Sequence, residues 1–298
     1  MTAPHPPASR APTAAGVEVN RPLEGLRAVA ALLVLFTHLA SSASGNQYGY
    51  ARYTGRFDVG VTIFFVISGY LLYLPFARGL TGLRPKPELR SYLRRRVLRI
   101  FPAYWVVMLV SAFIYERAMP MNASELFRYL TLTHIYTPST FDNPVPPAWS
   151  LSTEVAFYAF LPLFAWAISR LPSRSDTQRV RNQWLGLGAM VLVAFAARAW
   201  LSSPGVPAPG RPATGSMVEP LTVVSLKAWI FNHLDTFAVG MGLALFQVNR
   251  ERRTAVTERG AGPDAATWST TAGRNVSIAG VVVAVAAFLA VSSNRVGL

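Results

Sequence analysis

The chain has 298 residues, of which 52% are hydrophobic and only 14% are charged. Ordinary soluble domains carry about 25% charged residues, so this composition excludes a typical soluble protein and favours a membrane protein. The formal net charge is +14, but the basic residues lie in clusters between apolar runs and no nucleic-acid-binding module is present. Cysteine is absent, which excludes disulfides and thiolate metal sites. We expect neither a nucleic-acid partner nor a bound metal.

Residues 1–20 are rich in Pro, Ala, Ser and Thr and contain too little apolar material to pack, which predicts a disordered tail. Residues 21–298 would form one membrane domain. Seven runs in it approach the ~20 residues that a spanning helix needs. They cover residues 27–44, 57–77, 97–115, 149–169, 184–201, 228–248 and 276–292. We therefore predict an all-α, polytopic bundle of about seven transmembrane helices in a lipid bilayer.

The basic residues also predict an orientation. The tail and the 78–99, 170–183 and 249–275 loops hold 20 of the 28 Lys and Arg residues. Placing these segments in the cytoplasm satisfies the positive-inside tendency, so the N-terminus is expected inside. Among the external connections, the 118–148 loop contains a segment typical of a short amphipathic helix, from Ser124 to Ile135, and 202–220 resembles a flexible loop.

Arg27 and His38 stand at the two ends of the first apolar run, eleven residues apart. On a helix they lie ~16 Å apart, which is about half of a bilayer's hydrocarbon core. We therefore expect Arg27 at the membrane surface and His38 near the midplane. An ionisable side chain at that depth indicates a functional site. Hydrogen bonds to a neighbouring helix are an equally good explanation for the histidine alone.

Arginines gather before the third span, in the sequence LRRRVLRIFPAYW. Arg96 and Arg99 are three residues apart and share a helical face. Arginine suits phosphate because it donates two parallel hydrogen bonds and stays charged. This pair could therefore bind a phosphate-bearing donor, such as acyl-CoA, at the cytoplasmic face. Lipid headgroup contacts are the alternative, which we favour for Arg90, Arg94 and Arg95.

Ser68 in the second span, within FFVISGYLLY, could share a level with His38. The alternative is a small packing pair with Gly69, in which the Ser68 hydroxyl donates to a carbonyl one turn earlier. Phe64 and Phe65 are expected in the core.

Polar groups begin several spans near the predicted external face. They are Asp58, Ser150 with Glu154, and Asp235. Ser150 and Glu154 share a helix face because they are four residues apart. Carboxylates at this depth usually face a cavity or a partner, so a pocket for a hydroxylated acceptor is one explanation. Helix capping by Asp58 or Ser150 is the other.

Five motifs in this order resemble the acyltransferase 3 family of membrane acyltransferases, which includes bacterial enzymes that O-acetylate polysaccharides and other cell-surface glycans. The motifs lie between Arg21 and about Phe246 and read RPLEGLRAVAALLVLFTHL, GVTIFFVISGYLLY, RRRVLRIFPAYW, PAWSLSTEVAFYAFLPL and FAVGMGLALF. In the second motif, Thr62 stands where the family often has an acid. Family members usually have more spans than this chain supplies, so the resemblance implies a domain without its C-terminal spans.

The resemblance also implies roles for individual residues. The family's Arg/Lys-x10-His element matches Arg27 and His38, with the histidine catalytic. Its Arg-x-x-Arg element, on the side expected to receive acyl-CoA, matches Arg96 and Arg99. Two further elements, W-S-L-x-x-E and FF-x-x-SG, match Trp149, Ser150, Leu151 and Glu154, and Phe64, Phe65, Ser68 and Gly69.

Together these features predict an integral-membrane O-acyltransferase of a bacterial cytoplasmic membrane. It would transfer an acyl group, expected to be acetyl, from cytoplasmic acyl-CoA to a hydroxyl of a glycan, glycolipid or secondary metabolite. No tightly bound cofactor is expected. His38 would take the acceptor's proton or carry the acyl group, with Glu154 orienting the imidazole. Two alternatives remain open: a transporter or flippase that uses histidine and acids as a proton relay, and a non-catalytic membrane scaffold.

Overall fold

The computed structural model describes residues 21–43, 59–115, 122–141, 145, 147–203 and 221–260. The predicted tail, the seventh predicted span, most of the 202–220 loop and Asp58 lie outside these ranges. Every regular element in the described part is a helix. The long ones are α1 (Arg21–Ala43), α3 (Val59–Leu80), α4 (Leu89–Tyr115), α6 (Ala148–Arg170), α7 (Asp176–Leu201) and α9 (Leu234–Gly260).

Three of the described helices, α3, α6 and α7, are long and apolar enough to cross a membrane. Large apolar side chains face outward from several helices. Leu192 of α7, Leu163 of α6 and Leu109 of α4 are 71%, 65% and 63% exposed. Outward apolar surface of this kind is typical of helices in contact with lipid. The all-helical class is thus confirmed for the described residues, and three of their helices are candidate spans, whereas the number of seven spans stays a prediction.

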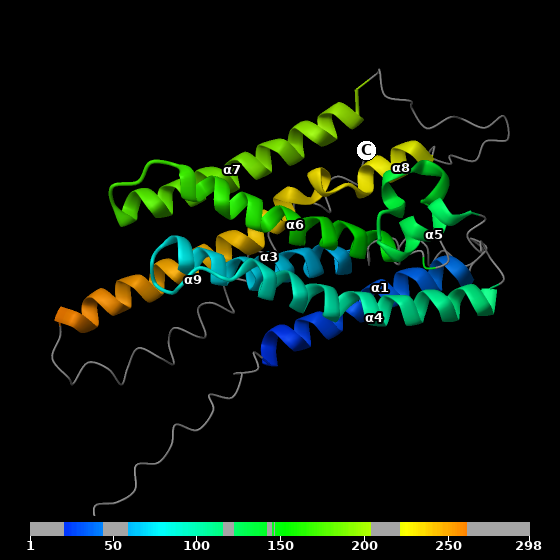
Figure 1. Ribbon diagram of the computed structural model, residues 1–298, viewed down its shortest axis with the longest axis horizontal. Coiled ribbons are helices and arrows are strands. Elements are labelled where there is room, and N and C mark those ends of the chain that lie inside the picture. Colours follow the sequence, from blue (N-terminus) through cyan, green and yellow to red (C-terminus); the bar gives the residue numbers. More distant parts are fainter. Residues whose placement is uncertain are drawn as a thin grey trace, which may run out of the picture.

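Helix α3 lies in the middle of the bundle, with α1 and α4 on one side and α6 and α7 on the other (Figure 1). Its most extensive contacts are with α9, which crosses it at two glycines. A Cβ atom on Gly69 would lie 2.3 Å from the Phe237 carbonyl oxygen, and one on Gly240 would lie 1.9 Å from the Val66 carbonyl oxygen. Glycine at these two positions therefore allows the backbones to approach closely.

Short elements gather at one end of the bundle. They are α5 (Ala123–Leu130), η1 (His134–Tyr136), η2 (Pro138–Thr140) and α8 (Leu221–Ala228), and η3 (Ile230–His233) joins α8 to α9. Helix α5 confirms the predicted amphipathic helix but ends five residues earlier than expected. It ends because Leu132 adopts a left-handed backbone (φ 58°), which turns the Thr133 N–H back to the Arg128 carbonyl at 2.9 Å.

Candidate functional site

A cavity of about 350 Å³ lies between α1, α3, α4 and α6. It brings together side chains from four of the sequence motifs. Its polar lining includes Arg27 of α1, Ser68 of α3, Arg99 of α4, and Glu154 and Tyr158 of α6. The other walls are mainly apolar, so that few polar groups converge on an apolar space, as in many small-molecule sites.

The Glu154 carboxylate is the centre of the hydrogen bonding in this cavity. Its Oε1 atom accepts from the Ser68 hydroxyl at 2.7 Å and from the Tyr158 hydroxyl at 2.7 Å. Among the described residues, none donates to its Oε2 atom. The packing interpretation expected the Ser68 hydroxyl to donate to a carbonyl of its own helix, but it donates to Glu154 instead. Gly69 beside it does pack against α9, as that interpretation expected.

The two arginines of the Arg-x-x-Arg motif have different surroundings. Arg99 lines the cavity, together with Arg27. Arg96 does not; its guanidinium carbon lies 5.8 Å and 5.9 Å from the ring centroids of Tyr92 and Tyr158. Arg96 thus forms a cation–π contact with the ring of Tyr158, and the hydroxyl of this tyrosine donates to Glu154.

Groups that we expected at the cytoplasmic surface, at mid-depth and near the external face line one cavity, and their depth in a membrane stays a prediction. Ser68 is the tenth of the 22 residues of α3, so the cavity lies beside the middle of a candidate membrane span. Arg27, Arg99 and Glu154 line this same cavity. The sequence had placed the arginines at the cytoplasmic surface and Glu154 near the opposite face. Charge counts along each segment do not show how far one helix is displaced along its axis relative to its neighbours. This axial displacement decides which side chains meet in the cavity.

His38 also differs from its expected level. A Cβ atom on Gly60 would lie 2.6 Å from the Ala30 carbonyl oxygen and 2.9 Å from Val34 Cγ2, which aligns the start of α3 with the middle of α1. From this contact, Ser68 lies ~12 Å along α3 in one direction and His38 at least ~6 Å along α1 in the other. The two residues therefore do not share a level. The backbone of His38 belongs to α1, and its side chain lies outside the described residues.

Trp149, Ser150 and Asp235 are not among the residues that line the cavity, whereas Phe64 and Leu151 of the family elements are. The Trp149 ring packs 5.7 Å from the His233 ring and 6.5 Å from the Phe65 ring. The Ser150 hydroxyl donates to the Pro147 carbonyl at 2.9 Å and accepts no capping hydrogen bond. Asp235 accepts from the Arg198 guanidinium, which also donates to the Asn232 carbonyl at 2.7 Å, so it links α9 to α7.

Two tyrosines of the cavity were missed in the sequence. Tyr158 follows Glu154 by four residues, a spacing that places both on one helix face and could have indicated the pair. Tyr104 also lines the cavity, but its hydroxyl donates to the Tyr129 carbonyl at 2.9 Å. Nothing in the local sequence distinguishes Tyr104, because its position depends on the packing of α4 against α5.

The site therefore combines two guanidinium groups with one carboxylate. The guanidinium groups can bind a phosphate or polarise a carbonyl, since both donate charge-assisted hydrogen bonds. The carboxylate can accept a proton or a hydrogen bond from a hydroxyl. These capacities suit the transfer of a group from an anionic donor to an alcohol.

Comparisons with known proteins agree with this chemistry. Residues 20–294 match the model of a family described as an acyltransferase domain, Acyl_transf_3. Acyltransferase MdmB of Streptomyces mycarofaciens is 29% identical over 205 residues, which cover 64% of this chain and 49% of that protein. Nodulation protein 10 of Rhizobium leguminosarum bv. viciae is 27% identical over 207 residues, with 59% and 49% covered.

A third relative is the peptidoglycan O-acetyltransferase OatA of Listeria monocytogenes, which is 26% identical over 235 residues, or 72% of this chain and 34% of that protein. The chain thus spans about half the length of the first two relatives and about a third of this one. No solved structure matches the chain significantly.

Proposed function

Because this chain belongs to the acyltransferase 3 family, we propose that it is an integral-membrane O-acyltransferase that uses acyl-CoA, with acetyl-CoA as the first candidate. The acceptor would be a hydroxyl of a glycan, a glycolipid or a secondary metabolite. The observation that carries this proposal is the cavity in which Arg27, Arg99, Ser68 and Glu154 meet. The similarity to the peptidoglycan O-acetyltransferase OatA supports a glycan as the first acceptor to test.

In this proposal Arg27 and Arg99 hold the phosphates of acyl-CoA, for which the guanidinium fork is suited. The acyl arm then extends along α1 towards His38, which follows Arg27 by ~16 Å of helix. That separation suits an extended donor whose phosphates and thioester lie at opposite ends of the molecule. Arg96 acts on the donor only through Tyr158.

His38 acts as the general base. It takes the proton of the acceptor hydroxyl as the oxygen attacks the thioester carbon; the C–S bond breaks, and the CoA thiolate leaves and is protonated. Glu154 is the second essential group. Its carboxylate fixes the Ser68 and Tyr158 hydroxyls in the cavity that holds the donor.

The orientation belongs to the same proposal. The N-terminus and the 78–99 loop face the cytoplasm of a bacterial cell, where acyl-CoA is available, and residues 21–298 belong to the acyltransferase domain. Asp58, Trp149, Ser150 and Asp235 remain candidate acceptor-side residues.

The test uses detergent-permeabilised membranes that contain the full chain, acetyl-CoA labelled in the acetyl group, and peptidoglycan fragments as the acceptor probe. Label should appear in the glycan with release of one CoA per acetyl group. His38→Ala should abolish transfer while the thermal unfolding of the purified protein is unchanged. Full transfer by His38→Ala would remove the histidine from the mechanism. Movement of labelled glycan across sealed vesicles without CoA release would instead indicate a transporter.

A further inference from the structure

A second cavity, of about 290 Å³, lies outside the site described above. It is bordered by the end of α3 and the loop that follows, the end of α6 and the start of α7. Gly79 of α3 and Ser169 of α6 line it, each eleven residues beyond Ser68 and Tyr158 of the first cavity. The two cavities are therefore ~16 Å apart along both helices.

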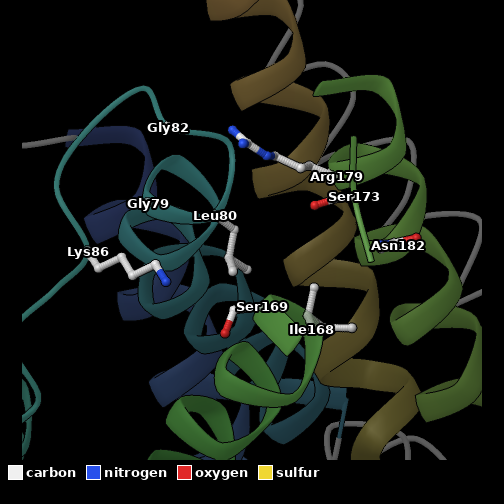
Figure 2. A pocket seen from close by; sticks show the side chains of 9 residues that line it. All are labelled: Gly79, Leu80, Gly82, Lys86, Ile168, Ser169, Ser173, Arg179 and Asn182. Atoms are coloured by element: carbon white, nitrogen blue, oxygen red, sulfur yellow. The ribbon is translucent and has the colours of Figure 1, made fainter. Parts of the chain in front are cut away.

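Two cations dominate this second cavity. The Lys86 ammonium and the Arg179 guanidinium enter it from opposite sides, above the Ser169 hydroxyl (Figure 2). Neither Asp nor Glu is among the described residues that line it. Ser173 adds a hydroxyl that has no partner in the described part of the chain. Its lining is therefore positively charged. The Ser169 hydroxyl and the Asn182 amide, which also line it, donate to the Trp166 and Pro172 carbonyls.

Existing ion pairs leave both cations available. Lys86 forms no ion pair with any described carboxylate. Arg179 contacts Asp176 at 3.4 Å, but their side chains are 45% and 55% exposed, and such exposed pairs contribute little. The other oxygen of Asp176 accepts from Arg252 at 2.6 Å, so this single negative charge is shared between two arginines.

At the end of α3, the backbone presents few free carbonyls to an anion in the cavity. A helix C-terminus normally presents free carbonyls, which repel negative charge. At the end of α3 these carbonyls are occupied, since the Leu83 N–H donates to the Arg78 carbonyl at 3.0 Å and the Gly82 N–H to the Gly79 carbonyl at 3.3 Å. Gly82 adopts φ +77°, which allows this turn.

We propose that the cavity lined by Lys86, Arg179 and Ser173 binds a phosphate group, carried either by an anionic lipid headgroup or by a soluble phosphate compound. The site lies at the helix ends on the arginine-rich side of the bundle, where a membrane protein meets both lipid phosphates and soluble anions. Lysine supplies a point charge and arginine a planar fork, a combination that suits a phosphate. This proposal uses none of the residues of the acyl-transfer proposal. The soluble probe used below is also a fragment of CoA, so its binding at the first cavity has to be separated with Arg99→Gln.

The experiment measures thermal unfolding of the purified full chain at constant ionic strength, in two arms. In the lipid arm, nanodiscs of phosphatidylglycerol are compared with nanodiscs of phosphatidylcholine. In the soluble arm, adenosine 3′,5′-bisphosphate is titrated onto the protein in phosphatidylcholine nanodiscs. Ligand that binds the folded state raises the unfolding temperature, so either arm reports binding.

We expect the unfolding temperature to rise in one of the two arms. The arm in which it rises identifies the source of the phosphate. In Lys86→Gln, and more strongly in Lys86→Gln with Arg179→Gln, this shift should disappear or need at least ~10-fold more probe, since charge-assisted hydrogen bonds are lost. Lys86→Arg should restore most of it. The matched control, Arg90→Gln with Arg94→Gln, removes the same charge from exposed positions near the start of α4 and should leave the shift unchanged.

Three results would overturn the proposal: no stabilisation of the unmodified chain in either arm, an equal shift in Lys86→Gln, or an equal loss in the control. The single variant Lys86→Gln is expected to fold normally, because Lys86 has no described ion pair that its replacement could break. A lost shift in this variant therefore reports lost binding. Arg99→Gln distinguishes binding at this cavity from donor binding at the first cavity. In this variant, the part of the rise in unfolding temperature that depends on Lys86 should be unchanged.

Discussion

At the scale of single residues, one carboxylate oxygen of Glu154 accepts hydrogen bonds from Ser68 and Tyr158, which belong to different helices. Two donors on one oxygen are coupled, because the remaining bond strengthens when the other is removed. The two hydroxyls should therefore act as a unit in catalysis, as groups within one hydrogen-bond network do.

We predict that Ser68→Ala and Tyr158→Phe together lower the transfer rate by more than the product of their separate effects. The expected coupling energy, obtained from the ratios of kcat/KM, is about 0.5 kcal/mol or more. Tyr104→Phe is the control, since the Tyr104 hydroxyl lines the same cavity but donates to the Tyr129 carbonyl. Its effect should combine additively with Ser68→Ala. If the effects of Ser68→Ala and Tyr158→Phe on the activation free energy were strictly additive, this would contradict the geometry in which both hydroxyls donate to one oxygen.

A second residue-scale prediction concerns His134, which lies in the short elements at the end of the bundle. Its ring is fully buried beside Tyr129, and both ring nitrogens lack a hydrogen-bond partner among the described residues. Burial lowers the pKa of His134 from 6.5 to about 4. Between these pH values the unfolded chain binds a proton that the folded chain excludes, so the stability due to neutral His134 is complete above pH 6.5 and is lost as the pH falls towards 4.

Thermal unfolding between pH 7 and pH 4 measures this effect. The unfolding temperature should fall over this interval, and the fall should be smaller in His134→Phe, which keeps an aromatic ring beside Tyr129 but cannot be protonated. An identical pH profile for the variant would show that other groups control acid sensitivity.

At the scale of elements, the crossing of α3 and α9 determines how Ser68 is presented to the cavity. Gly240→Ala would place a Cβ atom 1.9 Å from the Val66 carbonyl oxygen, on the helix that carries Ser68. The helices must then move apart, which should cost about 1–3 kcal/mol or more in stability and lower the transfer activity as well.

The control for this prediction is Gly188→Ala in the middle of α7, where a Cβ atom would meet nothing within 4 Å. That change should stabilise the helix by about 0.5–1 kcal/mol. Both values come from thermal unfolding of the purified protein. Equal behaviour of the two alanine variants would show that the crossing is looser than described.

The helices themselves could be predicted from the sequence because each long apolar run is a local property. Six of the seven predicted runs correspond to described long helices, and the motifs predicted Arg27, Arg99, Ser68 and Glu154 as site residues, which the cavity brings together. The offset between helices could not be predicted. It depends on non-local contacts such as that of Gly60 with Ala30 and Val34, and this contact moves His38 away from the level of Ser68.

At the scale of the whole molecule, the arginine-rich loops lie at one end of the bundle, the cavity beside its middle, and the short elements around α5 and α8 at the other end (Figure 1). This arrangement suits a donor that enters from the arginine-rich end and an acceptor that enters from the opposite one. We propose that Arg99, which is exposed but lines the cavity, binds the donor, whereas Arg94, which is exposed and does not line the cavity, does not bind it.

The most direct test is the KM for acetyl-CoA of Arg99→Gln compared with that of Arg94→Gln, in membranes that contain equal amounts of folded protein. A lost hydrogen bond to a charged group costs about 1.5–3 kcal/mol, so Arg99→Gln should raise this KM ~10-fold to ~100-fold. Arg94→Gln, which removes the same charge from an exposed position outside the cavity, should leave the KM within about twofold of the original value. An unchanged KM in Arg99→Gln, or an equal rise in both variants, would contradict donor binding in this cavity.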